Sequence, residues 1–124
     1  MYDILTIGDI KLDTFILIPE ASVLCELKMP SCQLCIEYGT KIPVDDVETQ
    51  VAGSAPNVAI GIAKMRKTAT VYSEMGKDIF HQIAKDFLQR NKVDSKYVKA
   101  AAGKDSSFAA VLNYKGESTQ LVSH

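Results

Sequence analysis

The repeat of apolar residues along this chain changes near residue 52, from every second residue to every third or fourth. Over 22–29 every second residue is apolar, which is typical of a half-exposed strand. From 79 to 88 the apolar residues recur at i, i+1, i+4, i+5, i+8 and i+9, which places them on one face of a helix. A chain that carries both repeats needs strands and helices, so the sequence predicts an α/β fold.

Local signals place the boundaries of these elements. Ser54 is a candidate N-cap for a first helix, whose predicted buried face consists of Val58, Ile62 and Met65. Asp78 is positioned to cap the second helix. Strands are predicted over 2–10, 15–18, 22–29, 32–38, 44–51, 68–75 and 97–100, with a hairpin over 107–123.

The order of the elements indicates two layers. Helices that alternate with apolar strands favour a parallel sheet covered by helices. The polar-faced stretches 22–51 and 106–123 do not suit a sheet that is covered on both faces. We therefore expect them to form a separate, partly exposed antiparallel layer.

The charge balance excludes several classes of protein. Fourteen basic residues against fifteen acidic residues give a net charge of -1, which argues against a nucleic-acid-binding surface and against a polybasic membrane patch. No apolar run approaches the roughly 20 residues of a membrane span. The first residues lack a basic segment followed by a long apolar run, so no signal peptide is predicted. We expect a cytoplasmic protein with reduced thiols.

The three cysteines, Cys25, Cys32 and Cys35, are spaced C-x6-C-x2-C. An odd number is a poor framework for disulfides. Zinc binding lacks a nearby fourth ligand, because the only histidines are His81 and His124. Redox chemistry would need C-x-x-C at the start of a helix, whereas this pair lies in a strand-like stretch. We interpret all three as free, metal-free thiols in or near a sheet.

Three motifs follow one another with suitable elements between them. They are GDIKLD at 8–13 after a strand, AGSAPNVA at 52–59 opening a helix, and GKD at 76–78 after a strand. This order resembles the N-terminal portion of the ribokinase-like (PfkB) carbohydrate kinase family. One position departs from the family pattern, because Arg66 stands where the family usually has Gly or Ser.

The resemblance implies a fold and an activity. The fold is a partial ribokinase-like doubly wound α/β sheet with a small β-sheet lid, and 1–124 is the N-terminal part of one kinase domain. The α/β part comprises 1–15 and 52–105, and the lid strands comprise about 16–51 and 106–123. The implied activity transfers the γ-phosphate of ATP to a hydroxymethyl group of a sugar or nucleoside.

The resemblance also implies a substrate site formed by Asp13, Gly53, Ser54, Asn57 and Lys11. Asp13 would bind sugar hydroxyls, Gly53 would present its backbone, and Asn57 would add a side-chain amide. Lys11 and Ser54 depart from the residues usual in ribokinases, which leaves the substrate open. The alternatives are that Asp13 is a turn residue, that Asn57 only caps the helix, and that Gly53 serves only chain geometry.

No catalytic residue is predicted in this chain. The family takes its catalytic base from a Gly-Ala-Gly-Asp motif at a helix start in its second half. Ala101–Asp105 (AAGKD) lacks the second glycine and precedes a predicted strand. We expect no metal site and no cofactor here, with ATP and Mg²⁺ used by a full-length relative.

Two functions remain open at this point. The first is the substrate-binding half and lid of a sugar or nucleoside kinase, inactive by itself. The second is a non-catalytic sugar-binding or dimerisation module. In either case the expected ligand is a small sugar or nucleoside.

An uncovered apolar face in the lid predicts self-association. The residues of this face are Val23, Cys25, Leu27, Cys32, Leu34 and Ile36. Soluble monomers rarely leave such a patch in water, so we expect a homodimer formed through the lid strands. The main sheet is also expected to have an open edge strand.

Overall fold

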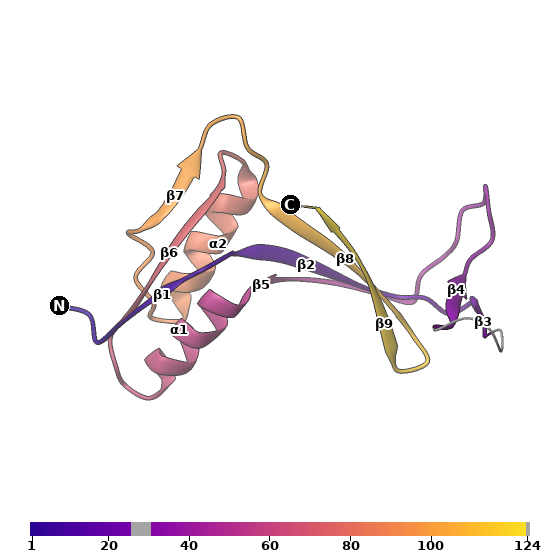
Figure 1. Cartoon of the computed structure of the whole chain (residues 1–124), viewed down its shortest axis with the longest axis horizontal. Coiled ribbons are helices and arrows are strands. Elements are labelled where there is room, and N and C mark those ends of the chain that lie inside the picture. The colour runs from indigo at the N-terminus through magenta and orange to yellow at the C-terminus, as the bar shows by residue number, and fades with distance from the viewer. Residues whose placement is uncertain (26–30, 124) are drawn as a thin grey trace.

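The computed structural model describes residues 1–25 and 31–123. Its elements in chain order are β1 (Ile4–Ile7), β2 (Lys11–Leu17), β3 (Ser22–Leu24), β4 (Gln33–Cys35), β5 (Asp46–Ala52), α1 (Ser54–Lys64), β6 (Ala69–Gly76), α2 (Ile79–Arg90), β7 (Val98–Ala101), β8 (Ser107–Tyr114) and β9 (Glu117–Ser123). Figure 1 shows a body that holds both helices and a long sheet that extends away from it. No helix in these two described stretches is long and apolar enough to cross a membrane.

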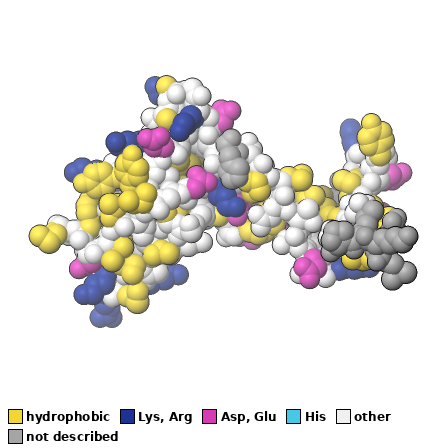
Figure 2. Space-filling model, viewed as in Figure 1, with side chains coloured by type: hydrophobic (Ala, Val, Ile, Leu, Met, Phe, Trp, Pro, Cys, Tyr) yellow, Lys and Arg dark blue, Asp and Glu magenta, His cyan; other side chains and the backbone are white. Residues whose placement is uncertain are grey.

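The body is built on a three-stranded parallel sheet in the order β1-β6-β7, called the parallel sheet below. Alternate residues of its central strand, Ala69, Val71 and Met75, enter one core together with Ala59 of α1 and Leu88 of α2. Both helices therefore cover the same face of the sheet. On the other face Leu5 is 51% exposed and Ile7 is 72% exposed, and Figure 2 shows apolar side chains gathered over this part of the body. β1 and β7 are both open edges of this sheet, because each pairs only with β6 among the described strands.

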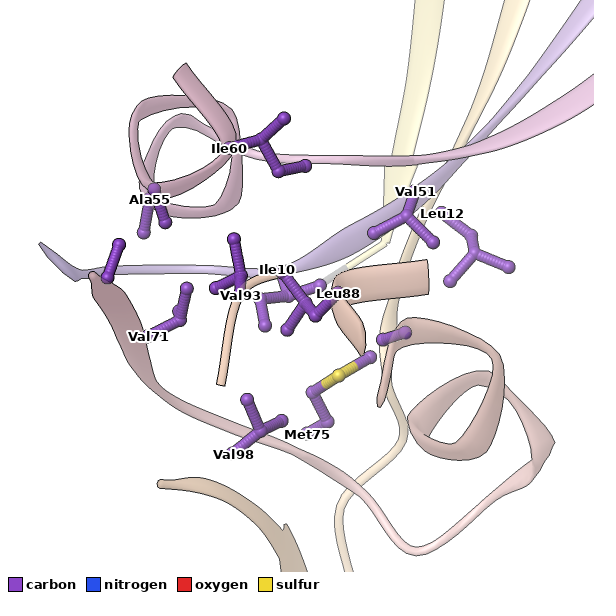
Figure 3. Close-up of a cluster of buried hydrophobic side chains, with 13 residues drawn as sticks. Ile10, Leu12, Val51, Ala55, Ile60, Val71, Met75, Leu88, Val93 and Val98 are labelled. Atoms are coloured by element: carbon purple, nitrogen blue, oxygen red, sulfur yellow. The ribbon is translucent and has the colours of Figure 1, made fainter. Parts of the chain in front are cut away.

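The core extends from the helices to the base of the second sheet (Figure 3). Ile10 is fully buried, and Leu12 of β2 and Val51 of β5 join the same cluster. The two sheets consequently share one hydrophobic core, which fixes β2 and β5 where they leave the body. Burial of each such side chain stabilises the fold by roughly 1.5–3 kcal/mol before the cost of ordering the chain.

The second sheet has four strands in the order β5-β2-β8-β9 and is called the mixed sheet below. Its β2–β8 pair is parallel, whereas the β2–β5 and β8–β9 pairs are antiparallel. The prediction of a purely antiparallel layer was therefore wrong. The sheet also starts at Lys11 rather than near residue 16, because the predicted strand over 2–10 ends at Ile7 and the chain crosses between the sheets over 8–10.

The β3–β4 hairpin lies at the far end of the mixed sheet in Figure 1. Val23 of β3 pairs with Leu34 of β4, so these two members of the predicted apolar face do lie on one side. Leu27 and Met29, which were predicted to continue that strand, lie outside the described residues. Tyr114 of β8 donates a hydrogen bond to the carbonyl oxygen of Ala21 at 2.6 Å and ties the hairpin to the mixed sheet.

The prediction of three free thiols was wrong. Cys25 and Cys32 form a disulfide, with their Cα atoms 4.3 Å apart, and only Cys35 is free. The chain reverses between β3 and β4, which brings these two residues together although seven positions separate them. Two sulfurs that are bonded to each other are not zinc ligands, and the histidine His124 lies outside the described residues.

The two helices match the sequence prediction in position but not in every contact. Asp78 caps α2 as predicted, because its side chain accepts a hydrogen bond from the amide of His81 at 3.2 Å. In α1 the predicted buried face was correct only for Ile62, which packs against the core, since Val58 is 53% exposed and Met65 is 65% exposed. Small residues face the sheet instead, including the fully buried Ala59, since they allow the helix to approach closely.

Candidate functional site

Gly53 lies where β5 ends and α1 begins, and it is the N-cap residue in place of the predicted Ser54. Its backbone has φ 121° and ψ 151°, a conformation that other residues rarely adopt. A Cβ at this position would lie 2.3 Å from the carbonyl oxygen of Asp9. Chain geometry therefore requires glycine here, and the crossing segment 8–10 is held against the start of α1.

Asp13 lies inside β2, so the alternative that it is a turn residue is excluded. It is 9% exposed, and Lys11 Nζ lies 3.3 Å from its Oδ1 on the same face of the strand. This contact is an ion pair that lacks hydrogen-bond geometry, and Oδ1 accepts no hydrogen bond from the described residues. Asp13 is thus nearly buried, and its Oδ1 can still accept a hydrogen bond.

Ser54 and Asn57 lie in the first turn of α1, and both are exposed. The amide of Asn57 donates to the carbonyl oxygen of Gly53 at 3.2 Å, which closes the first turn. No side chain caps this end of the helix. The alternative that the Asn57 side chain serves as a cap is therefore wrong. The side chains of both residues are available to a ligand.

The structure brings the motifs at 8–13 and 52–59 together. Lys11 pairs with Ala52 across the β2–β5 ladder, directly beside Gly53. Ser107 pairs with Lys11 from the other side, and its hydroxyl donates to Asp9 Oδ1 at 3.4 Å. The contact of Ser107 was missed by the sequence analysis, because no local pattern links two residues that are 98 positions apart.

The third motif, at 76–78, has a different role in the structure. Asp78 accepts hydrogen bonds from the amide and the hydroxyl of Ser106, each at 2.8 Å. Burial raises the pKa of Asp78, but the bonds from Ser106 and His81 outweigh burial and lower the pKa below its ordinary value. Gly76 fits beneath this cluster, where a Cβ would lie 2.5 Å from the Ser106 nitrogen. The motif therefore anchors the segment that enters β8.

Asp105, the aspartate of the AAGKD segment, is exposed and precedes a strand. The expectation that β8 follows in place of a helix is confirmed. No helix N-terminus lies at this aspartate to receive a phosphate.

Among the comparisons with known proteins, one family model matches the chain. The model of the pfkB family carbohydrate kinases matches residues 21–124. No curated protein matches the sequence.

Solved ribokinases share the fold. The fold is similar to ribokinase from Giardia lamblia, with TM-score 0.77, 19% identity, and 99% of this chain and 36% of that chain covered. Ribokinase from Arabidopsis thaliana, complexed with ribose and ATP, gives TM-score 0.76 and 17% identity over 96% of this chain and 35% of that chain. The Methanocaldococcus jannaschii nucleoside kinase gives TM-score 0.69 and 18% identity over 96% and 36%.

The chain spans about a third of the length of these solved structures. Identities this low show a shared fold and nothing finer. The family match has a different basis, because it comes from the sequence pattern and covers most of the chain. The chain therefore belongs to the pfkB family of carbohydrate kinases.

Proposed function

We propose that the chain forms the substrate-binding half and lid of an ATP-dependent sugar or nucleoside kinase. The observation that carries this proposal is Asp13, a carboxylate that is 9% exposed and whose Oδ1 accepts no hydrogen bond from the described residues. Buried acceptors are normally satisfied, so this one favours a ligand that supplies hydroxyl donors.

The neighbouring residues suit the same ligand. Lys11 orients the Asp13 carboxylate through their 3.3 Å contact. The exposed side chains of Ser54 and Asn57 offer further donors and acceptors at the start of α1, where unpaired backbone N–H groups also lie. A sugar in this position would therefore meet polar groups from β2 and from α1.

In the proposed reaction the γ-phosphate of ATP passes to a hydroxymethyl group of the bound sugar. We assign the catalytic base and the sites for ATP and Mg²⁺ to a part of the kinase domain outside these 124 residues. The exposed loop position of Asp105 supports this assignment.

Binding measurements test the substrate site. We expect calorimetric titration of the 124-residue chain with ribose and adenosine to detect binding of at least one, and Asp13→Asn to abolish it. Asp86→Asn is the matched control, because it makes the same chemical change on an exposed residue of α2. Equal binding by the wild type and Asp13→Asn would contradict the proposal.

Activity measurements test the assignment of the catalytic groups. With ATP, Mg²⁺ and a panel of sugars and nucleosides, the 124-residue chain should show no turnover above a buffer blank. Acceptor-dependent ATP consumption that disappears in Asp105→Asn would contradict this expectation and would restore Asp105 as a catalytic base.

A second candidate function is a non-catalytic sugar-binding or dimerisation module. The exposed apolar side chains at the end of the mixed sheet favour its dimerisation form, since Val23 is 52% exposed and Ile36 is 51% exposed. Ligand binding without dimerisation would favour the kinase half, and dimerisation without ligand binding would favour the module.

A further inference from the structure

An open cavity of about 370 Å³ lies on the mixed sheet beside the candidate site. Its lining residues are Phe15, Leu17, Asp46, Glu48, Gln50 and Asn113. Gln50 lies opposite Asp13 in the β2–β5 ladder, and Phe15 is the next residue after Asp13 on the same face of β2. The cavity therefore continues directly from Asp13, and its volume falls within the roughly 300–1,000 Å³ of small-molecule sites.

The two sides of this cavity differ in chemistry. Phe15 and Leu17 form an apolar side along β2, and Asp46 and Glu48 form an acidic side along β5. An ionised carboxylate only accepts hydrogen bonds, so the acidic side selects ligand groups that carry N–H or O–H donors. Asp46 already accepts a bond from the amide of Val47 at 2.9 Å. Glu48 is therefore the carboxylate that is better able to bind a ligand.

The charge of the cavity disfavours anionic ligands. Its charged lining residues are both acidic, and Lys11, farther along the same face, is already paired with Asp13. A phosphate or carboxylate on the ligand would face like charges at short range. The cavity thus suits a neutral group that is flat on the side of Phe15 and donates hydrogen bonds on the side of Glu48.

We propose that this cavity receives the base of a nucleoside whose ribose is bound at Asp13. Phe15 stacks on the base, and Glu48 accepts a hydrogen bond from an amino group on its edge. A two-residue step along a strand is about 7 Å, so a base joined directly to the sugar reaches Phe15 while the hydroxyls remain at Asp13. This inference rests on the proposed function and narrows its substrate to nucleosides with amino-bearing bases.

Cytidine and uridine are the matched ligands, because an amino donor in cytosine is replaced by a carbonyl acceptor in uracil. By calorimetric titration of the 124-residue chain, cytidine should bind about tenfold more tightly than uridine. Glu48→Gln should bring the two affinities close together, since an amide both donates and accepts. Phe15→Leu should weaken both nucleosides and leave ribose unchanged.

The control variant is Glu117→Gln, on the opposite face of the mixed sheet, which should leave all these affinities unchanged. Equal affinities for cytidine and uridine, or nucleosides that bind no more tightly than ribose, would overturn the cavity assignment. If ribose still binds and Asp13→Asn abolishes its binding, the proposed function stands. If neither ribose nor any nucleoside binds, both proposals fail together.

Discussion

Gly53 combines an unusual backbone conformation with a close contact to the Asp9 carbonyl oxygen. We predict that Gly53→Ala lowers the free energy of unfolding by roughly 1–3 kcal/mol. The new Cβ would clash with the Asp9 carbonyl oxygen, and an alanine is strained in this backbone conformation. Gly61→Ala is the control, since a Cβ there meets no atom within 4 Å and a helical alanine adds roughly 0.5–1 kcal/mol. Urea unfolding measures both, and an unchanged stability for Gly53→Ala would contradict the assigned contact.

Asp78 leads to a prediction of how the free energy of unfolding depends on pH. Its pKa lies below the ordinary value of 3.8 in the folded state, so its stabilising bonds are complete above pH 3.8 and are lost as the pH falls through the lower folded-state value. Below pH 4 the free energy of unfolding should therefore fall less steeply in Asp78→Asn than in the wild type. Asp3 and Asp94 also have lowered pKa values, because Thr68 and Tyr2, respectively, donate to them, so part of the acid dependence should remain.

Ser106→Ala is the graded control for this experiment. It removes the hydroxyl that donates to Asp78 and keeps the backbone N–H that also donates. The acid dependence should therefore be intermediate between the wild type and Asp78→Asn. Identical slopes in all three proteins would show that Asp78 does not contribute to acid unfolding.

At the scale of elements, the disulfide in the β3–β4 hairpin gives a direct chemical prediction. Thiol titration of the denatured, unreduced chain should report one free thiol in the wild type, none in Cys35→Ser, and two in Cys25→Ser. Disulfides are rare in cytosolic proteins. The cytoplasmic location therefore stays a prediction, and the same titration on protein taken from cells also tests it. Three free thiols in the wild type would contradict the bond.

The sequence predicted those elements whose signals are local. The apolar repeat over 79–88 and the cap at Asp78 located α2, and the motif containing Gly53 located the start of α1. The exposed Val58 was predicted to be buried, because helical spacing identifies an apolar stripe without showing which side faces the sheet. The crossing over 8–10 was missed, because the apolar Ile10 was predicted to continue the strand although Gly8 and Asp9 interrupt it.

The sequence likewise predicted only part of the candidate site. Asp13 and Gly53 are found by their motifs, and the structure brings their elements together through the β2–β5 ladder. The contact between Asp9 and Ser107 and the cavity beside Phe15 depend on strand register. Register between β2 and β8 joins residues almost a hundred positions apart, and no spacing within the sequence encodes it.

For the whole molecule, the prediction concerns assembly. We expect a dimer that buries the apolar face of the β3–β4 hairpin, and Val23→Glu should dissociate it by placing charge in that contact. Leu24→Glu is the control, because Leu24 is similarly exposed at 47% but points to the other face of the same strand. Light scattering on the purified chain measures the mass. A wild-type monomer at tens of micromolar would contradict the prediction.

The close contacts of Gly53 with Asp9 and of Gly76 with Ser106 lie where the chain passes between the two sheets. A tilt of the mixed sheet relative to the body would pivot about these two contacts, since in each of them a glycine lies directly against the backbone of the other residue. The pivot lies beside Asp13, and the β3–β4 hairpin lies at the far end of the sheet (Figure 1). The substrate groups thus lie close to the pivot, and the hairpin lies far from it. A rotation too small to displace the substrate groups noticeably would therefore move the hairpin over a much larger distance.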